Sequence, residues 1–167
     1  MYYLMEYTSP AGLLPLCASE TALTGLWIKD QKYFGSALKG KELLNQETPV
    51  LSLARSWLDR YFAGEAPDIG ELPLEPEGSP FRQLVWDILC KIPYGQTTTY
   101  KEIANRVAQL TGQKSMSAQA VGGAVGHNPI SIIIPCHRVL GSDGSLTGYA
   151  GGIAVKEMLL RHEGVNI

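Results

Sequence analysis

The sequence predicts a two-domain α+β protein, in which antiparallel strands and a helix precede a mostly helical domain containing a helix-turn-helix. Three observations lead to this fold class. The chain has 167 residues, 45% of them apolar, which suffices for a packed core in one or two domains. A proline-rich acidic segment at residues 66–78 divides it into domains at 1–65 and 79–167. Strand-like runs come before this segment, and helical periodicity follows it.

The dividing segment also separates two different charge balances. Residues 64–80 hold four prolines and five acidic residues but no basic one, which predicts an extended linker. Residues 1–79 carry 6 basic and 11 acidic residues, whereas residues 80–167 carry 8 and 5. The net charge of −2 for the whole chain therefore does not exclude nucleic-acid binding by the second domain.

The first domain is expected to contain antiparallel hairpins and one helix. Strand-like runs cover residues 2–7, 12–17 and 22–28, with turn-forming residues between them. Thr48 can cap a helix that starts at Pro49 and ends at Gly64. No charged constellation here suggests catalysis, so we expect this domain to be structural.

The second domain opens with three expected helices. Ser79 and Pro80 start the first, which stops at residues 92–95. Thr99 and Glu102 form a capping box for the second, which ends near residue 110. The third spans about residues 117–126, and the short glycine-containing turn before it gives a helix-turn-helix pattern.

The third helix contains three glycines, each of which costs about 1 kcal/mol relative to alanine in a helix interior. Either tight packing against a neighbouring helix or close approach to a nucleic-acid backbone would explain them. Residues 130–134 are expected to form a short buried strand, and residues 141–152 a glycine-rich loop with a wing-like turn at 143–144. A helix at about 153–163 closes the chain.

Cys136 is the strongest candidate for a reactive group. It is flanked by two potential cations, His137 and Arg138, which are surroundings that lower a thiol pKa and create a nucleophile. Cys17 and Cys90 lie among apolar residues and are expected to be small buried hydrophobes. Because adjacent side chains do not face each other on a strand, a water should bridge Cys136 and His137. Glu163 is a candidate to fix the other imidazole nitrogen.

Several other classes are excluded. No run of about 18 apolar residues predicts a membrane span, and the N-terminus lacks the features of a signal peptide. Three cysteines, an odd number, argue against a disulfide scaffold and for a reducing, cytoplasmic location. The cysteines are far apart and no CxxC or HxxxH pair exists, so we expect neither metal nor cofactor.

The motifs around Cys136 are similar to those of a known family. The pentapeptide PCHRV at 135–139, with Asn128 and Pro129 before it and TGYAGG at 147–152 after it, resembles the O6-alkylguanine-DNA alkyltransferases, or methylated-DNA–protein-cysteine methyltransferases. The resemblance covers residues 79–163, and in the first domain it extends only to the order of elements. It implies a small ribonuclease-H-like domain followed by a winged helix-turn-helix domain.

The resemblance also implies a function. An alkyl group would pass from O6-alkylguanine in double-stranded DNA, with O4-alkylthymine as a second candidate substrate, to the protein's own cysteine in a single irreversible turnover. The resemblance implies repair by a monomer that binds the minor groove and flips the damaged base, with no cofactor and no membrane.

The resemblance assigns roles to individual residues. Cys136 would accept the alkyl group, His137 would take its proton through a water, and Glu163 would orient His137. Asn128 would brace the turn, and Tyr100 would rotate the nucleotide and donate to the base. The carbonyls of Cys136 and Val139 would accept from the base's amino group. The residues implied to contact DNA or the base are Gln119, Ala120, Gly122, Gly123, Val125, Arg138, Val139, Thr147, Tyr149 and Ala150.

The sequence departs from the family pattern at three points. Gln119 stands where the family usually has the arginine that fills the gap left by the flipped base, and Ala150 stands where some members have serine. The zinc site that some members carry is absent, since Cys17 is the only cysteine or histidine in the first domain.

Two alternatives remain open. A non-catalytic alkyltransferase-like protein would bind the lesion, but such proteins replace the acceptor cysteine, which is present here. A cysteine hydrolase would need an oxyanion-stabilising motif, which the sequence lacks around Cys136.

Overall fold

The computed structural model describes residues 1–29, 31 and 38–167, which form two compact units. The first unit comprises Met1–Glu77 together with Pro129–Ile133, and the second comprises Gly78–Asn128 and Ile134–Ile167. The boundary at Glu77 lies close to the expected one. The assignment of Pro129–Ile133 to the first unit was not predicted.

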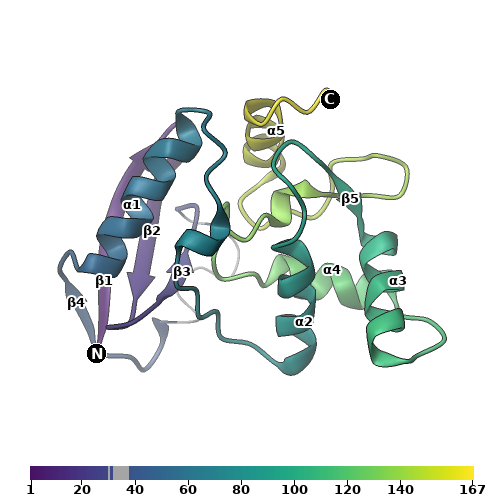
Figure 1. The fold of residues 1–167 in the computed structure, drawn as a ribbon, viewed down its shortest axis with the longest axis horizontal. Helices are drawn as coiled ribbons and strands as arrows, with labels where there is room; N and C mark the ends of the chain where they lie inside the picture. The colour runs from purple at the N-terminus through teal and green to yellow at the C-terminus, as the bar shows by residue number, and fades with distance from the viewer. Residues whose placement is uncertain (30, 32–37) are drawn as a thin grey trace. The chain divides into compact units, whose positions relative to one another are not determined.

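The first unit is built on a four-stranded sheet with one helix against it. The order of strands is β3-β2-β1-β4; β1 and β2, and β2 and β3, pair antiparallel, which confirms the predicted hairpins. The short β4, which the sequence did not predict, pairs parallel to β1. Helix α1 lies across one face of the sheet (Figure 1). The bounds are β1 Tyr2–Ser9, β2 Gly12–Ala18, β3 Leu23–Leu26, β4 Leu43–Asn45 and α1 Pro49–Phe62.

Helix α1 forms as its capping residues predict. The Thr48 side chain accepts a hydrogen bond from the Leu51 amide, and Pro49 occupies the first turn. The expected apolar face packs into the core of the first unit. Its buried residues are Val50, Leu51, Ala54, Trp57, Leu58 and Tyr61.

The proline-rich segment 66–78 is more ordered than the expected extended linker. It contains the short helix η2 (Ile69–Glu71), and Leu74 forms a parallel bridge with Leu23 of β3. The Leu23 amide donates to the Pro73 carbonyl, and the Glu75 amide donates to the Leu23 carbonyl. Proline lacks an amide donor but keeps its carbonyl, so this segment can still pair along the edge of a sheet.

The second unit contains four helices and a two-stranded ladder. Ser79 and Thr99 each cap a helix, as predicted, and Ser117 caps the helix that was expected to start near it. The predicted capping box is half formed, because the Glu102 carboxylate accepts from the Thr98 hydroxyl instead. Helices α3 and α4 pack together as a helix-turn-helix requires. The elements are α2 Pro80–Leu89, α3 Tyr100–Thr111, α4 Ala118–Gly126, α5 Ile153–His162, and parallel strands β5 Thr98–Thr99 and β6 Val139–Leu140.

The predicted strand at 130–134 is wrong. Only Ile130 forms a bridge, to Leu26, and the chain then turns around Ile132, which is buried with a φ of 71°. A β-branched residue in this left-handed region costs about 1–2 kcal/mol or more. The apolar run predicted burial correctly, but burial alone does not require a strand. The wing-like turn is present, with Gly144 donating to the Gly141 carbonyl.

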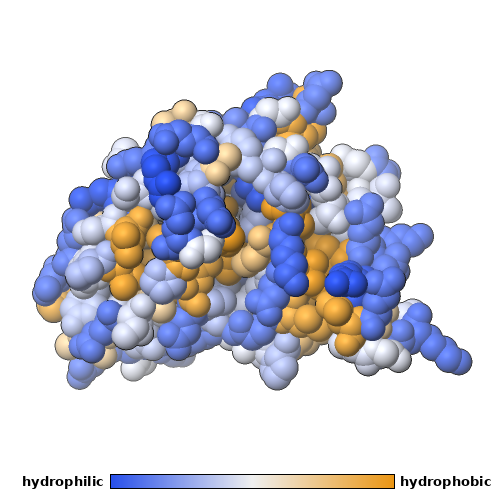
Figure 2. All heavy atoms as spheres, in the orientation of Figure 1, coloured by the Kyte–Doolittle hydropathy of each residue, from blue (hydrophilic) through white to orange (hydrophobic). Residues whose placement is uncertain are grey.

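The surface seen in Figure 2 is a mosaic of hydrophilic and apolar groups. Leu53 of α1 and Leu110 of α3 are each 50% exposed. Among the described residues, no helix is long and apolar enough to cross a membrane.

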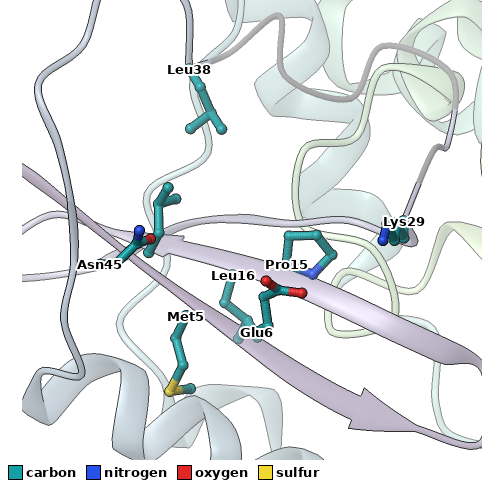
Figure 3. Close-up of a pocket in the computed structure, with 8 residues that line it drawn as sticks. Met5, Glu6, Pro15, Leu16, Lys29, Leu38 and Asn45 are labelled. Atoms are coloured by element: carbon teal, nitrogen blue, oxygen red, sulfur yellow. The ribbon is translucent and has the colours of Figure 1, made fainter.

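The first unit contains a cavity of about 470 Å³ (Figure 3). Apolar side chains line most of it, and Glu6, Lys29 and Asn45 supply the polar groups. None of the predicted catalytic residues is among its described lining residues, so the cavity is not the candidate active site.

Candidate active site

Cys136 begins a single turn of tight helix, η3 (Cys136–Arg138), and not the end of a strand. Pro135 precedes it with φ −82° and ψ 63°, and the Cys136 amide donates to the Ile134 carbonyl at 2.8 Å. Successive side chains of such a turn point about a third of a revolution apart. The chain can therefore direct His137 and Arg138 away from the Cys136 thiol, which is 5% exposed.

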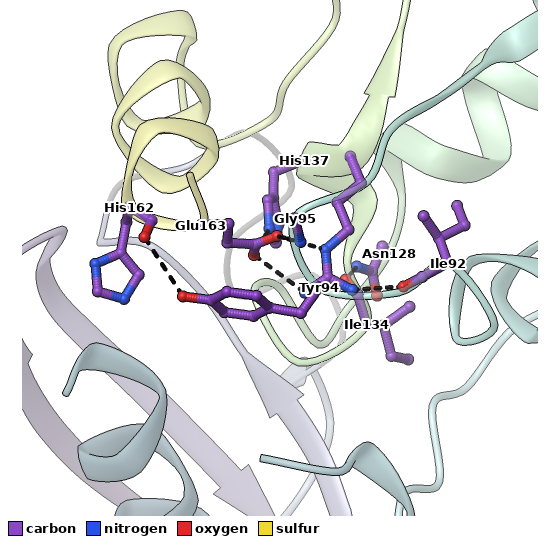
Figure 4. Close-up of polar contacts among 9 residues, drawn as sticks. Ile92, Tyr94, Gly95, Asn128, Ile134, His137, His162 and Glu163 are labelled. Atoms are coloured by element: carbon purple, nitrogen blue, oxygen red, sulfur yellow. Dashed lines mark hydrogen bonds and ion pairs between the residues drawn. The ribbon is translucent and has the colours of Figure 1, made fainter. Parts of the chain in front are cut away.

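The Glu163 carboxylate gathers four donors at the end of α5 (Figure 4). His137 Nε2 lies 2.6 Å from its Oε2, and Arg138 donates through Nε at 2.8 Å and Nη2 at 3.1 Å. The Gly95 amide adds a fourth bond at 3.1 Å. This buried carboxylate is thus fully paired, and the predicted contact between His137 and Glu163 is present.

The charges in this cluster determine which imidazole nitrogen can act as a base. Burial by itself would raise the pKa of Glu163, but His137 and Arg138 hold it well below its usual range. Burial lowers the pKa of His137 despite Glu163, so the imidazole is neutral. Since the carboxylate accepts from Nε2, the Nδ1 atom carries the lone pair. In the described part of the structure, this buried Nδ1 has no hydrogen-bond partner.

The thiol of Cys136 does not have the lowered pKa that its sequence neighbours predicted. Burial raises its pKa, and a hydrogen bond from Asn128 and the charge of Lys156 oppose this only in part. Arg138 is paired with Glu163 and His137 is neutral, so neither supplies a free positive charge. The thiol must therefore lose its proton to a base during the reaction.

Lys156, which sequence analysis missed, is fully buried beside the site. Its Nζ donates to the Val139 and Thr147 carbonyls and lies 5.8 Å from the centre of the Tyr100 ring. Burial lowers the pKa of Lys156 to about 8, although the charge of Cys136 raises it. The ammonium connects β6 with the loop that precedes α5.

Tyr100, the first residue of α3, lies against the same loop. Its hydroxyl donates to the Thr147 carbonyl at 3.0 Å, and burial and the charge of Cys136 raise its pKa to about 12. A Cβ at Gly148, where φ is 69°, would lie 3.1 Å from the Tyr100 hydroxyl. Glycine is needed there both for the backbone conformation and for this close approach.

The exposed face of α4 consists of small residues and Gln119. Ala120 and Gly123 are also exposed. A Cβ added at Gly123 or Gly126 would meet no atom within 4 Å in the described part of the chain. Packing within the protein therefore does not explain these two glycines, which favours close approach by a ligand.

The structure brings some predicted site residues together and removes others from the surface. Thr147 is exposed, and Gly122, Tyr149 and Ala150 are half-buried. Val125, predicted to contact DNA, packs in the core, and Arg138 is held by Glu163 and the Ile92 carbonyl. These two side chains serve the interior, and contact of either residue with DNA stays a prediction.

Residues 92–95 were predicted only to stop a helix, and the structure places two of them against the site. The Tyr94–Gly95 pair ends the segment after α2, where the Tyr94 hydroxyl reaches the His162 carbonyl at 3.4 Å and Gly95 binds Glu163. A glycine after a proline-aromatic pair indicates a turn, but not its partner. Val139 is buried, and its carbonyl is bound by Lys156.

Comparison with known proteins identifies both units. Residues 1–76 match the model of the ribonuclease-like domain of 6-O-methylguanine DNA methyltransferase, and residues 80–165 match the model of its DNA-binding domain. A methylated-DNA–protein-cysteine methyltransferase of Haemophilus influenzae is 40% identical over 96% of this chain and 86% of its own length. One from Mycolicibacterium paratuberculosis is 42% identical over 93% of this chain and 88% of its own.

Solved structures of methyltransferases are also similar to this chain. The O6-methylguanine methyltransferase of Mycobacterium tuberculosis is 41% identical, with a TM-score of 0.80 over 98% of this chain and 93% of that one. The structure of the same organism's OGT in complex with DNA is 40% identical, with a TM-score of 0.80 over 97% of this chain and 91% of that one. With both domain models matched in order along its length, the chain belongs to the 6-O-methylguanine DNA methyltransferase family.

Proposed function

We propose that this protein repairs DNA by transferring an alkyl group from O6 of guanine to the sulfur of its own Cys136. The observation that carries the proposal is the thiol placed one residue before the buried His137–Glu163 pair. The names of the relatives specify methylated DNA as donor and a protein cysteine as acceptor in those proteins. The presence of Cys136 disfavours the alternative of a lesion-binding protein that cannot accept the group.

The reaction is a displacement at the alkyl carbon. The Cys136 thiol gives its proton, through a water, to Nδ1 of His137, and the sulfur forms a bond to carbon as the bond from carbon to O6 breaks. Glu163 stabilises the imidazolium that forms. The guanine that leaves takes up one proton, so the products are a thioether and an unmodified base. The described residues suggest no group that would cleave the thioether, and each protein would act once.

Tyr100 is the proposed donor to the departing base. Its hydroxyl now binds the Thr147 carbonyl, and a base entering beside the 147–151 loop would compete for that proton. Lys156 would keep the Thr147 carbonyl in place when Tyr100 changes partner. The backbone carbonyls of Cys136 and Val139 are the proposed acceptors for the base's amino group.

The small-residue face of α4 is the proposed contact with the minor groove of double-stranded DNA. Gln119, Ala120, Gly122 and Gly123 form it, and the open space beside Gly123 permits backbone approach. Because the alkylated oxygen lies within the base stack, the nucleotide must be flipped out to reach Cys136. O4-alkylthymine presents a similar alkyl–oxygen bond and is a second candidate substrate.

A single chain carries every proposed group, so we infer that the protein acts as a monomer without a cofactor. The three cysteines are free thiols, and the reaction needs one of them reduced, which suits the cytoplasm.

Intact-mass analysis after incubation with duplex DNA containing O6-methylguanine tests the proposal. We expect the thiol hydrogen of one cysteine to be replaced by a methyl group, which peptide mapping should place at Cys136. Cys136→Ser should show no gain while binding DNA normally, and the matched control Cys90→Ser should be methylated like the wild type. Methylation of Cys136→Ser would overturn the assignment.

A further inference from the structure

The segment Pro129–Ile133 is held by the first unit, although the chain on both sides of it belongs to the second. The Leu26 amide donates to the Pro129 carbonyl, and the Ser131 amide donates back to the Leu26 carbonyl, both at 2.8 Å. The segment therefore adds a short parallel bridge at the end of β3. The sequence reaches Cys136 only three residues after this segment ends.

A buried polar contact strengthens this attachment. The Ser131 hydroxyl donates to Gln31 Oε1 at 3.2 Å, and the same oxygen accepts from the Ile28 amide at 2.7 Å. Ser131 is 2% exposed and Gln31 is 7% exposed. Most buried polar side chains are paired, and this contact pairs the Ser131 hydroxyl and holds it in place.

The residue after Ser131 has a strained backbone. Ile132 has a φ of 71°, and the Ile133 amide closes a tight turn around it by donating to the Ser131 carbonyl at 2.8 Å. A branched side chain holds this conformation only where its surroundings impose it. Ser131, bound through both its amide and its hydroxyl, is a fixed neighbour on one side of this turn, and Ile132 itself is fully buried.

The turn leads directly to the Ile134 carbonyl, on which the reactive thiol depends. This carbonyl accepts from Asn128 Nδ2 at 2.8 Å and from the Cys136 amide at 2.8 Å. Asn128 also makes the hydrogen bond that opposes the rise in the pKa of Cys136. A change in the direction of this carbonyl would move both Asn128 and Cys136.

We propose that Ser131 and Gln31 are positioning residues whose hydrogen bond holds the turn that places the Cys136 thiol for reaction. They act through the backbone and touch neither the thiol nor the substrate. The inference rests on the proposed function, because the reaction in question is the alkyl transfer to Cys136. According to this proposal, the ribonuclease-like unit contributes to the transfer reaction by fixing the chain immediately before Cys136.

Ser131→Ala tests this inference, with Thr24→Val as a matched control. Thr24 is also a buried hydroxyl of the first unit, and it donates to the Cys17 carbonyl at 3.2 Å, away from the segment. Two readouts are taken at a temperature where all proteins are folded. One is the single-turnover rate on O6-methylguanine DNA. The other is the pH at which iodoacetamide modifies Cys136 half-maximally without DNA, followed by peptide mass.

We expect Ser131→Ala to slow methyl transfer by about three- to tenfold, since a small misplacement of the reacting group lowers the rate strongly. The half-maximal pH of thiol modification should rise because Asn128 holds the thiolate less well. DNA affinity should not change, and Thr24→Val should match the wild type in both readouts. The charged and titratable neighbours of the thiol, His137, Tyr100 and Lys156, are the same in all three proteins.

Wild-type values for Ser131→Ala in both readouts would overturn the inference, as would equal shifts in Thr24→Val, which would indicate general destabilisation. Absence of methyl transfer by the wild type would instead reject the proposed function. The thiol modification profile needs no DNA, and so it would still decide the role of Ser131.

Discussion

His137 Nε2 lies 2.6 Å from Glu163 Oε2, and both side chains are fully buried. The Glu163 carboxylate also pairs with Arg138. This pairing keeps the carboxylate negatively charged while the His137 imidazole stays neutral. The proton on Nε2 therefore points at Glu163, and the lone pair is left on Nδ1. This arrangement lets a thiol with a raised pKa react, because the base can take the proton as sulfur attacks.

Glu163→Gln should slow methyl transfer by about a hundredfold or more, because the imidazolium loses its counter-charge. The variant should also unfold more easily, by about 3 kcal/mol, since Arg138 would remain buried without its partner. Glu157→Gln on the same helix is the control, because its exposed pair with Arg161 contributes under about 1 kcal/mol. Single-turnover assays and urea unfolding measure both effects, and equal rates for the two variants would contradict the account.

Lys156 should make stability depend on pH in the alkaline range. Its pKa in the folded protein is about 8, against about 10.4 in an unfolded chain. Below pH 8 it is protonated in both states. Between about 8 and 10.4 the unfolded chain keeps a proton that the folded protein has lost, so stability rises with pH.

The comparison of Lys156 with Lys156→Met isolates this effect. Both proteins should carry Cys136→Ser, because the charge of Cys136 raises the pKa of Lys156. The unfolding free energy of the lysine form, relative to the methionine form, should increase between pH 7 and pH 10 in urea titrations. A difference that stays constant or falls over this range would show that the lysine is not held with a lowered pKa.

Gln119→Arg should tighten binding to duplex DNA and steepen its salt dependence by up to about one unit, through release of a further counterion. Gln46→Arg, which adds the same charge at an exposed position of the first unit, should do neither. Gln119→Ala should slow transfer from duplex DNA more than from the free modified base, because only the duplex leaves a gap to fill. Equal effects on the two substrates would mean that Gln119 does not fill the gap.

Methyl transfer should not require a metal ion, because sulfur, the alkyl carbon and the imidazole supply the whole reaction. The described residues contain no group of three or more cysteine, histidine or acidic side chains able to hold a metal ion. Treatment with EDTA should leave the single-turnover rate unchanged. A loss of rate that zinc or magnesium restores would contradict this mechanism.

Local signals in the sequence predicted the helices well. Thr48, Ser79, Thr99 and Ser117 each cap the helix that follows, because capping depends on residues within one turn. The parallel strand β4 and the turn at Ile132 were missed, since both depend on partners far away in the sequence.

In the active site, too, the sequence did not show contacts that depend on the fold. The motif predicted Cys136, His137 and Glu163, but the predicted fall in the thiol pKa was wrong, because burial raises this pKa and Arg138 is paired with Glu163. The sequence assigned no role to Lys156, since lysines are usually exposed, and only the fold shows that this one is buried.

The number of methyl groups transferred per protein molecule distinguishes a single irreversible transfer to Cys136 from repeated turnover. Protein is mixed with an increasing excess of duplex DNA carrying O6-[methyl-³H]guanine, and the radioactivity bound to protein and the repaired base are both counted. We expect both to reach a plateau at one methyl group per protein, with all of the label at Cys136. Repair that continues beyond one equivalent, or label that remains outside Cys136, would contradict it.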